Sequence, residues 1–427
     1  MTSGPEITDP AGGTRAPLAL SVDGRLVFAA RALRSFGFGW LSVILALYLA
    51  GRGFSAAAIG GVFTATMVED ALLTMLLTSV ASRIGPAWLM AATAPLIAFG
   101  GILLATAESP WLLVVGAVLG TLSPNGQDAG PFSPLEHSLL PGAIRAGPSV
   151  RVFAWYNLVA FASAAAGAAT AGFVLGSEQR RGTPELEAQR GMLLAYAAMG
   201  LVLTGLYLWL ASRHAGRAKP APKPTGSLGL GRSRHVVLQL AGLQALDALA
   251  GGFIMQSLVV YWLHLRFDAS PEALGALFFG TNLLSALSFL VAARVAERVG
   301  LLNTMVFTHL PSNVLLLAVP FMPSFASAAA VLLARHLLSQ MDVPTRQAYT
   351  MALVASEERA AAAGLTVSVR ALAQAAAPVF AGVTMAAAAT PLPFLLAGGL
   401  KIVYDLALFF RFRSVPLPDS REAGRTS

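Results

Sequence analysis

The sequence predicts an all-α membrane protein in which twelve transmembrane helices form two pseudo-symmetric six-helix bundles. Two observations support this fold class. Of the 427 residues, 56% are hydrophobic and only 12% are charged, whereas about 25% of the residues of a soluble domain are charged. In addition, residues 35–85 align with residues 250–300 without a gap, at a constant offset of 215. An internal repeat of apolar spans indicates two halves of the same design.

The repeat includes small and turn-forming residues as well as apolar ones. The matched pairs are Gly37/Gly252, Phe38/Phe253, Ser42/Ser257, Ser55/Ser270, Gly60/Gly275, Phe63/Phe278, Thr66/Thr281, Ala71/Ala286, Leu72/Leu287, Ala81/Ala296, Arg83/Arg298 and Gly85/Gly300. Chance similarity between apolar segments does not usually keep one register through two spans and the polar turns that follow them. The sequence therefore indicates duplication of a helical unit.

A span of about 20 apolar residues crosses a bilayer, and this length divides the chain into its helices. The predicted helices are 25–50, 56–80, 86–106, 110–129, 150–175, 190–212, 235–265, 271–293, 300–320, 324–349, 360–387 and 391–411. Prolines at positions 86, 110, 148, 271 and 391 fall at or just before the start of a predicted helix, as expected for residues that mark the boundaries between spans.

Lys and Arg collect in alternate loops, which predicts that these loops and both termini are cytoplasmic in a multi-pass protein of the cell membrane. Topology thus accounts for the net charge of +8, and we expect membrane lipids rather than nucleic acid as partners. The predicted organisation is a disordered cytoplasmic N-terminal tail (1–24), an N-terminal six-helix bundle (25–212), a basic cytoplasmic linker (213–234), a C-terminal six-helix bundle (235–412) and a cytoplasmic C-terminal tail (413–427).

Several kinds of chemistry are disfavoured by the composition. The chain has no cysteine, its six histidines are dispersed without ligand spacing, and it has no phosphate-binding Gly-rich loop followed by Lys and Ser or Thr. We therefore expect no metal, no cofactor, no enzymatic activity and no direct use of ATP.

Similar turns follow the second helix of each half. The first, residues 78–87, keeps Ala81, Arg83 and Gly85 of the pattern Gly-x-x-Ala-Asp-Arg-x-Gly-Arg-Arg, and residues 293–300 add an acid. With six plus six helices and a basic central loop, the chain resembles the major facilitator superfamily of transporters. The resemblance implies a gating role for the loop residues Arg83, Gly85, Glu297, Arg298 and Gly300. The alternative is that the two arginines only set topology.

Ionisable residues inside the predicted spans are candidates for function, because each costs about 2.5–3.5 kcal/mol at the centre of a bilayer. Arg34 and Asp247 lie in the paired helices 1 and 7, which the resemblance places at a central cavity. A salt bridge between them that forms and breaks would bias the inward and outward states. Alternatively, Arg31 and Arg34 reach the cytoplasmic headgroups.

Other intramembrane charges are spaced for pairing along one helix. Asp342 and Arg346 are four residues apart, as are Lys401 and Asp405, so each pair is expected to form. Asp342 and Arg346 are either a structural pair, or Asp342 titrates while the gating residue Arg346 follows its charge. The candidates for proton coupling are Glu69, Asp70, Asp128 and Asp342.

These features predict a monomeric secondary active transporter that moves a small solute by alternating access, with protons as the driving ion. Aromatic residues in the expected cavity helices favour efflux of an amphipathic compound; they are Phe36, Phe38, Trp40, Phe253, Tyr261 and Trp262. The intramembrane arginines support an alternative, an organic or phosphorylated anion. A non-transporting scaffold or receptor is the alternative of another class. The candidate cavity residues are Arg34, Trp40, Asp247, Gln256, Arg335 and Arg370.

Overall fold

A computed structural model of the protein describes residues 20–126, 130–140, 149–214, 233–354, 358–386 and 391–415. The fold is all-helical, as predicted. Within the described residues, ten helical segments are long and apolar enough to cross a membrane. Most of the predicted linker and of both predicted tails lies outside the described residues.

The N-terminal half contains seven helices among its described residues. They are α1 (Val22–Gly51), α2 (Ala56–Ile84), α3 (Pro86–Thr106), α4 (Pro110–Leu119), α5 (Phe132–Leu139), α6 (Ser149–Arg180) and α7 (Glu185–His214). Helix α1 packs along α6 and α7, and α3 packs along α7, so that α1 lies inside the bundle. This position explains why nearly every residue of α1 from Ser35 to Leu49 is buried.

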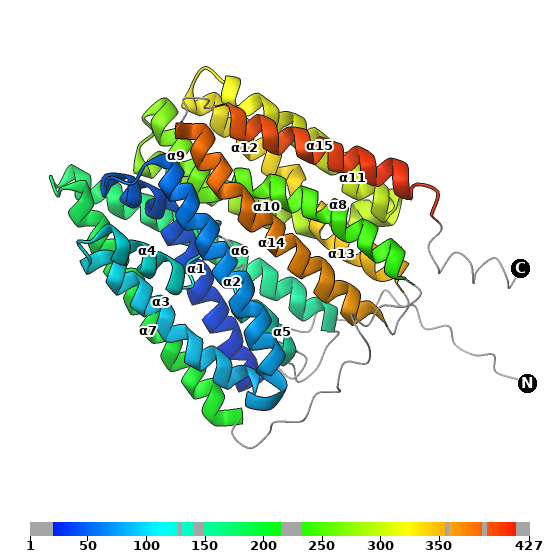
Figure 1. The fold of residues 1–427 in the computed structure, drawn as a ribbon, viewed down its shortest axis with the longest axis horizontal. Helices are drawn as coiled ribbons and strands as arrows, with labels where there is room; N and C mark the ends of the chain where they lie inside the picture. Colours follow the sequence, from blue (N-terminus) through cyan, green and yellow to red (C-terminus); the bar gives the residue numbers. More distant parts are fainter. Residues whose placement is uncertain are drawn as a thin grey trace, which may run out of the picture.

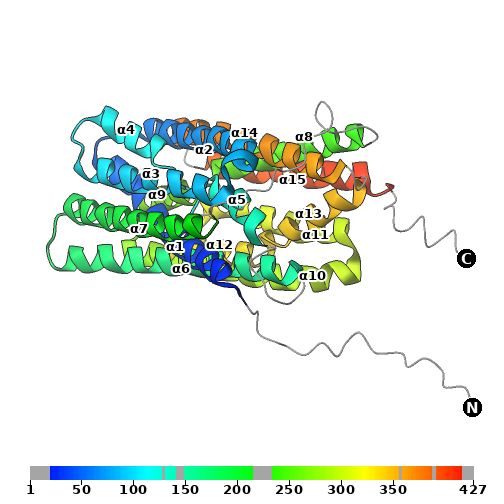
Figure 2. The same ribbon diagram turned by 90° about the horizontal axis from the view of Figure 1, so that it is seen from below.

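The C-terminal half follows the same plan with more interruptions. Its elements are α8 (Arg234–Phe253), α9 (Gln256–Phe267), α10 (Pro271–Val299), α11 (Leu301–Ala318), the short 3-10 helix η2 (Val319–Phe321), α12 (Phe325–Ser339), α13 (Asp342–Leu353), α14 (Arg359–Ala386) and α15 (Leu392–Phe412). Helix α8 packs against α14 and α15, and α11 packs against α12 and α15. In the view of Figure 2 the axes of the long helices of both halves lie roughly parallel to one another, irrespective of chain direction.

Three helices that the sequence predicts as continuous are interrupted. The predicted helix 110–129 stops at Leu119 and is followed by α5, the helix 235–265 breaks at residues 254–255, and the helix 324–349 breaks at residues 340–341. The first break coincides with the helix-breaking segment Ser123-Pro124-Asn125-Gly126. Irregular backbone is tolerated at membrane depth where protein or water surrounds it, and these breaks lie beside the polar residues described below.

The internal repeat is confirmed by equivalent structural roles. Ser55 and Ser270 both cap the helix that follows them, accepting hydrogen bonds from backbone N–H groups three residues further on. Gly85 and Gly300 both end a helix at positive φ, 95° and 86°, where glycine is favoured. The related serines even meet, because Ser257 Oγ donates to the carbonyl oxygen of Ser42 at 2.9 Å.

The two halves are joined along α2 with α14 and along α6 with α10. A Cβ on Gly60 would lie 2.2 Å from the Pro378 carbonyl oxygen, and one on Gly275 would lie 2.7 Å from that of Ala168. Arg180 also forms an ion pair with Glu272 across this seam. These contacts lie away from the side on which α1 begins and α15 ends, which we call the terminal side. Toward the terminal side the two bundles diverge (Figure 1).

Candidate functional site

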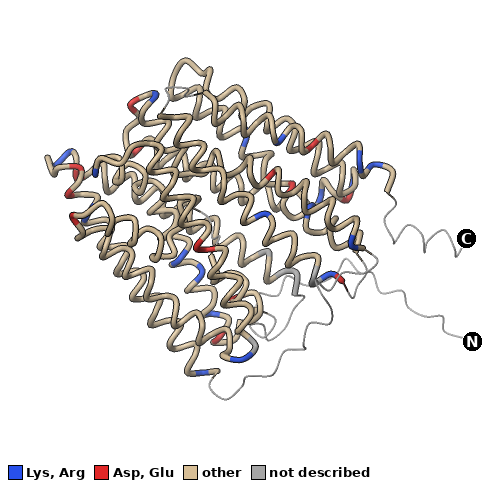
Figure 3. The backbone as a smooth tube through the Cα atoms, viewed as in Figure 1, with Lys and Arg blue, Asp and Glu red and all other residues tan. Residues whose placement is uncertain are grey.

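Charged residues occur within the bodies of both bundles as well as at helix ends (Figure 3). They form two groups, one in each half. The N-half cluster consists of Arg31, Arg34, Ser133, Glu136, Tyr156 and Tyr207. The C-half cluster consists of Asp247, His309, Arg335, Asp342, Arg346, Arg370, Lys401 and Asp405.

The N-half cluster centres on a fully buried carboxylate. Two nitrogens of the Arg34 guanidinium each donate to one oxygen of Glu136 at 2.8 Å. The Tyr207 hydroxyl donates to the same carboxylate at 2.6 Å, and the Tyr156 hydroxyl donates to its other oxygen. Both side chains of the ion pair have no exposed surface. This bidentate geometry satisfies the carboxylate and neutralises Arg34.

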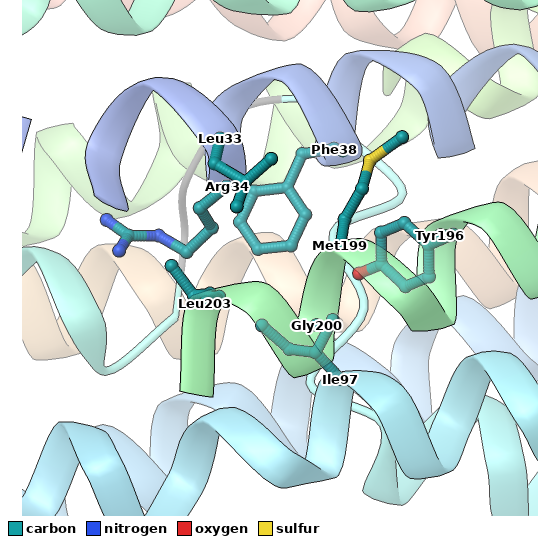
Figure 4. A pocket seen from close by; sticks show the side chains of 9 residues that line it. Leu33, Arg34, Phe38, Ile97, Tyr196, Met199, Gly200 and Leu203 are labelled. Atoms are coloured by element: carbon teal, nitrogen blue, oxygen red, sulfur yellow. The ribbon is translucent and has the colours of Figure 1, made fainter. Parts of the chain in front are cut away.

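Arg31 and Arg34 also pack against aromatic rings. The Arg31 guanidinium lies 4.5 Å from the centre of the Tyr156 ring and donates to Ser133 Oγ at 2.9 Å. The stem of Arg34 lines a void of about 10 Å³ beside Phe38, with its guanidinium directed away from Tyr196 (Figure 4). Such a void holds at most one water molecule. In this state the void beside Arg34 is too small for a solute.

Asp247 on α8 is the centre of the C-half cluster. Lys401 Nζ lies 2.6 Å from Asp247 Oδ1, while Arg346 and Arg370 each place a guanidinium nitrogen 3.1 Å from Oδ2. One carboxylate is therefore shared by three cations from α13, α14 and α15. The predicted bridge between Arg34 and Asp247, which would form and break between states, is not formed in this structure: Arg34 pairs with Glu136, and Asp247 pairs with Lys401.

The two expected pairs along single helices have different outcomes. Arg346 lies 2.6 Å from Asp342, so this pair is confirmed. The expected Lys401–Asp405 pair is wrong: Lys401 binds Asp247 instead, and Asp405 accepts from His309 Nδ1 at 2.8 Å and from Asn313 Nδ2 at 2.9 Å. Spacing of four permits a pair, but here carboxylates and donors on neighbouring helices are better placed.

Arg335 on α12 differs from the other cations of the C-half cluster. It is 7% exposed and within electrostatic range of Asp247 and Asp342. Among the described residues, no carboxylate lies within ion-pair distance of Arg335, and its Nε has no hydrogen-bond partner. One of its terminal guanidinium nitrogens lies 3.5 Å from His336 Nε2, which is a long contact. With His309 neutral, the C-half cluster holds four cations and three carboxylates.

The predicted polar and aromatic cavity residues mostly serve packing. The Trp40 indole donates to the Met192 carbonyl at 3.2 Å, and Gln256 donates to Ser42 Oγ at 2.6 Å across the seam. The buried aromatic residues of the expected cavity are Phe38, Trp40, Phe253 and Trp262. Tyr261 lines a cavity of about 320 Å³ between α1, α7 and α9, on the side away from the terminal side.

The candidates for proton coupling are spread over different environments. Glu69 is half-buried on α2, and its Oε2 has no hydrogen-bond partner among the described residues. Asp70, beside it, is buried. Asp342 is held by Arg346, and Asp128 lies outside the described residues. The structure does not bring Glu69, Asp70 and Asp342 together in one site.

The loop residues after α2 and α10 lie at exposed helix ends. Arg83 and Arg298 occupy the last turns of these helices, before Gly85 and Gly300. Arg83, Glu297 and Arg298 are exposed, and none of them forms an ion pair with another described residue. Arg346, the other predicted gating residue, is instead buried in the C-half cluster. A gating role for the loop residues stays a prediction.

Sequence reasoning missed Glu136 and His309. Glu136 was expected in a loop, because it lies between the predicted helices 110–129 and 150–175. In the structure this segment forms the helix α5, which buries Glu136. The one signal was a Glu among apolar residues shortly after the breaker segment. His309 lies inside a predicted span, and its intramembrane position was itself a signal. No group of His, Asp and Glu in the described part of the chain is arranged to hold a metal ion.

No family model matches the chain. An uncharacterised membrane protein of Saccharomyces cerevisiae, YJR124C, is 22% identical over 436 residues, which cover 95% of this chain and 97% of the yeast protein. The similarity therefore spans both halves.

Solved structures of transporters share the fold. The nucleoside transporter NupG has a TM-score of 0.68 at 13% identity, covering 92% of this chain and 100% of its own. An auto-inhibited peptide transporter of the POT family has a TM-score of 0.71 at 13% identity, with 93% and 98% covered. The human organic anion transporter MFSD10 has a TM-score of 0.61 at 17% identity, with 90% and 98% covered. The chain thus shares the fold of these transporters, and this is the fold that the resemblance noted in its sequence implies.

Proposed function

We propose that the protein is a secondary active transporter that moves a small organic or phosphorylated anion by alternating access of its two halves. The observation that carries the anionic cargo is Arg335, a buried guanidinium in a cluster with more cations than carboxylates. An uncompensated buried charge is costly, and its cost is relieved when a counter-charge arrives. A carboxylate or phosphate group fits a guanidinium fork by two parallel hydrogen bonds.

Arg370 is the second residue proposed to contact the anion. Its side chain is 24% exposed, more than the other cations bound to Asp247, and it donates to Asp247 and to the Gln244 carbonyl. It lies near the middle of α14, and Arg335 lies on the broken tenth span. An anion that reaches Arg370 would compete with Asp247 for the Arg370 guanidinium. The same anion would also form an ion pair with Arg335.

The arrangement of the halves supports alternating access. The glycine contacts at Gly60 and Gly275 join the halves on one side, whereas the bundles diverge toward the terminal side. We propose that the terminal side is cytoplasmic, in agreement with the excess of Lys and Arg in its loops. The protein would then face inward in this state, with one monomer forming the whole pathway.

Proton-coupled efflux of an amphipathic compound is the competing proposal. It rested on aromatic residues at an open cavity, but Phe38, Trp40, Phe253 and Trp262 are buried among neighbouring helices. The C-half cluster therefore favours the anion. A scaffold or receptor without transport activity has no evident use for surplus buried charge in a broken span.

Solute counterflow in proteoliposomes tests the proposal. Vesicles with the purified protein are loaded with one member of a panel of organic carboxylates and phosphate esters, and entry of the labelled compound is followed. A cationic amphipathic dye is assayed in parallel. We expect counterflow of an anion, with a loss of at least about tenfold in Arg335→Gln, corresponding to about 1.4 kcal/mol of binding.

The exposed Arg411→Gln variant is the matched control and should retain counterflow. Export of the dye without counterflow of any anion would favour the amphipathic cargo. An active wild-type protein whose anion counterflow is unchanged by Arg335→Gln would show that the site is placed wrongly.

A further inference from the structure

We propose that His309 is a proton-binding site coupled to anion binding, because its imidazole lies between the carboxylates of Asp405 and Asp247. His309 is on α11 and is 3% exposed. Its Nδ1 lies 2.8 Å from Asp405 Oδ1, and its Nε2 lies 3.9 Å from Asp247 Oδ1. Neither α11 nor α15, which carries Asp405, contributes to the cavity or proton-coupling residues predicted from the sequence.

The contacts around Asp405 favour one tautomer of the neutral imidazole. Asp405 accepts from Asn313 through Oδ2, and its Oδ1 lies 2.8 Å from His309 Nδ1, closer than the 3.2 Å between that nitrogen and Asn313 Nδ2. The shorter contact with a carboxylate favours a hydrogen on Nδ1. When Nδ1 carries the hydrogen, Nε2 presents its lone pair toward a carboxylate oxygen of Asp247. That arrangement leaves Nε2 as an acceptor opposite an acceptor. A proton on Nε2 converts this into a favourable contact between imidazolium and carboxylate.

Charged groups from every neighbouring element act on this proton. Asp405 on α15 and Asp247 on α8 favour it, and Asp342 on α13 adds to them at longer range. Lys401, Arg346, Arg370 and Arg335, from α15, α13, α14 and α12, oppose it. The Tyr404 ring packs edge-on against His309.

Protonation of His309 has two consequences for an anion site at Arg335 and Arg370. The imidazolium competes for Asp247 Oδ1, the oxygen bound by Lys401, and so weakens the hold of Asp247 on its cations. It also adds a positive charge to a cluster that already has a surplus. Both effects favour anion binding, and by linkage a bound anion favours the proton. Proton and anion would therefore move together in the same direction.

This coupling depends on the proposed anion transport, but the proton site is tested without any transported solute. The probe is the proton itself, titrated from about pH 5 to pH 9 on the full-length protein in lipid nanodiscs with ¹⁵N-labelled histidine, a range that brackets ordinary histidine titration. The resonance missing from His309→Gln identifies His309. We expect it to change from the neutral form with Nδ1–H to the imidazolium within this range.

Two variants test the neighbours. Asp405→Asn should lower the titration midpoint of His309 by about one pH unit or more, because it removes a close negative charge. Arg370→Gln should raise the midpoint, because a competitor for Asp247 is lost. His264→Gln, a histidine outside the C-half cluster, is the matched control and should leave the His309 titration unchanged.

The proposal is overturned if His309 stays in one form across the range, or if it titrates with a midpoint unaffected by Asp405→Asn. Retained near-wild-type spectra for the other histidines would show that the variants are folded. Conversely, a titrating His309 in a protein without anion counterflow would contradict the proposed function and leave the proton site in place.

Discussion

The N-half and C-half clusters both contain buried charged side chains, but these charges are paired differently in the two clusters. Around Glu136 a single guanidinium and two tyrosine hydroxyls use up both carboxylate oxygens. Around Asp247 three cations compete for two oxygens, and Arg335 has no carboxylate within ion-pair distance in the described part of the chain. Both oxygens of Glu136 already have strong donors, so an exchange of partners would lose hydrogen bonds. The cations around Asp247 share its two oxygens, so an exchange of partners there would cost less free energy.

We interpret the difference as a division of roles between two halves of similar design. A neutralised bidentate pair orients helices and stabilises the bundle. A cluster with shared carboxylates and surplus cations can accept an anion and redistribute its bonds. We therefore interpret the N-terminal half as the more rigid partner and the C-terminal half as the one that binds the solute.

The largest expected effect comes from Asp247→Asn. This change leaves Lys401, Arg346 and Arg370 without their shared charge, and breaking a buried pair from one side typically costs about 3–5 kcal/mol. Thermal unfolding of the detergent-purified protein should show a greater loss than in Glu136→Gln, which removes a carboxylate from only one of the described cations, Arg34. An equal or greater loss in Glu136→Gln would contradict the contrast between the clusters.

Arg335→Gln sharpens the comparison further, because it should separate function from stability. Arg335 has no carboxylate partner to lose, so the unfolding temperature should stay the same or rise, while anion counterflow falls by at least about tenfold, or 1.4 kcal/mol. Arg34→Gln is the matched variant of the N-half cluster. It should lower the unfolding temperature because Glu136 is left buried and uncompensated.

A double-mutant cycle tests the partner choice of Lys401. Lys401→Met combined with Asp247→Asn should show an interaction energy of about 1–3 kcal/mol in unfolding, since the two side chains are in contact. The same lysine variant combined with Asp405→Asn should be closer to additive. The opposite ranking would restore the pairing along α15 that spacing alone suggested.

The smallest expected effect is that of Tyr207→Phe in the N-half cluster. It removes one hydrogen bond to Glu136 while Arg34 and Tyr156 remain, so we expect a loss of about 1 kcal/mol in stability. Anion counterflow per folded molecule should match the wild type. A marked fall in counterflow without loss of stability would mean that the N-half cluster contacts the solute.

Much of the fold was predictable because it depends on local chemistry. Apolar spans of membrane length, serine caps at 55 and 270 and glycine turns at 85 and 300 follow from short-range rules, and the structure has all of them. The predicted helices 235–265 and 324–349 were expected to be continuous, and their breaks at residues 254–255 and 340–341 were not predicted. They depend on which neighbouring helices surround the exposed backbone.

The sequence by itself determined that this protein is a helical membrane protein with an internal repeat, and it identified most of the residues that carry buried charge, although not Glu136. Only the tertiary structure decided how those charges are paired. The pairs Asp342/Arg346 and Lys401/Asp405 have the same spacing of four residues. Asp342 forms an ion pair with Arg346, whereas Lys401 forms one with Asp247 on another helix. The physical reason is that buried ion pairs depend on distances of a few ångströms between separate helices, and helix packing sets those distances rather than position along the chain.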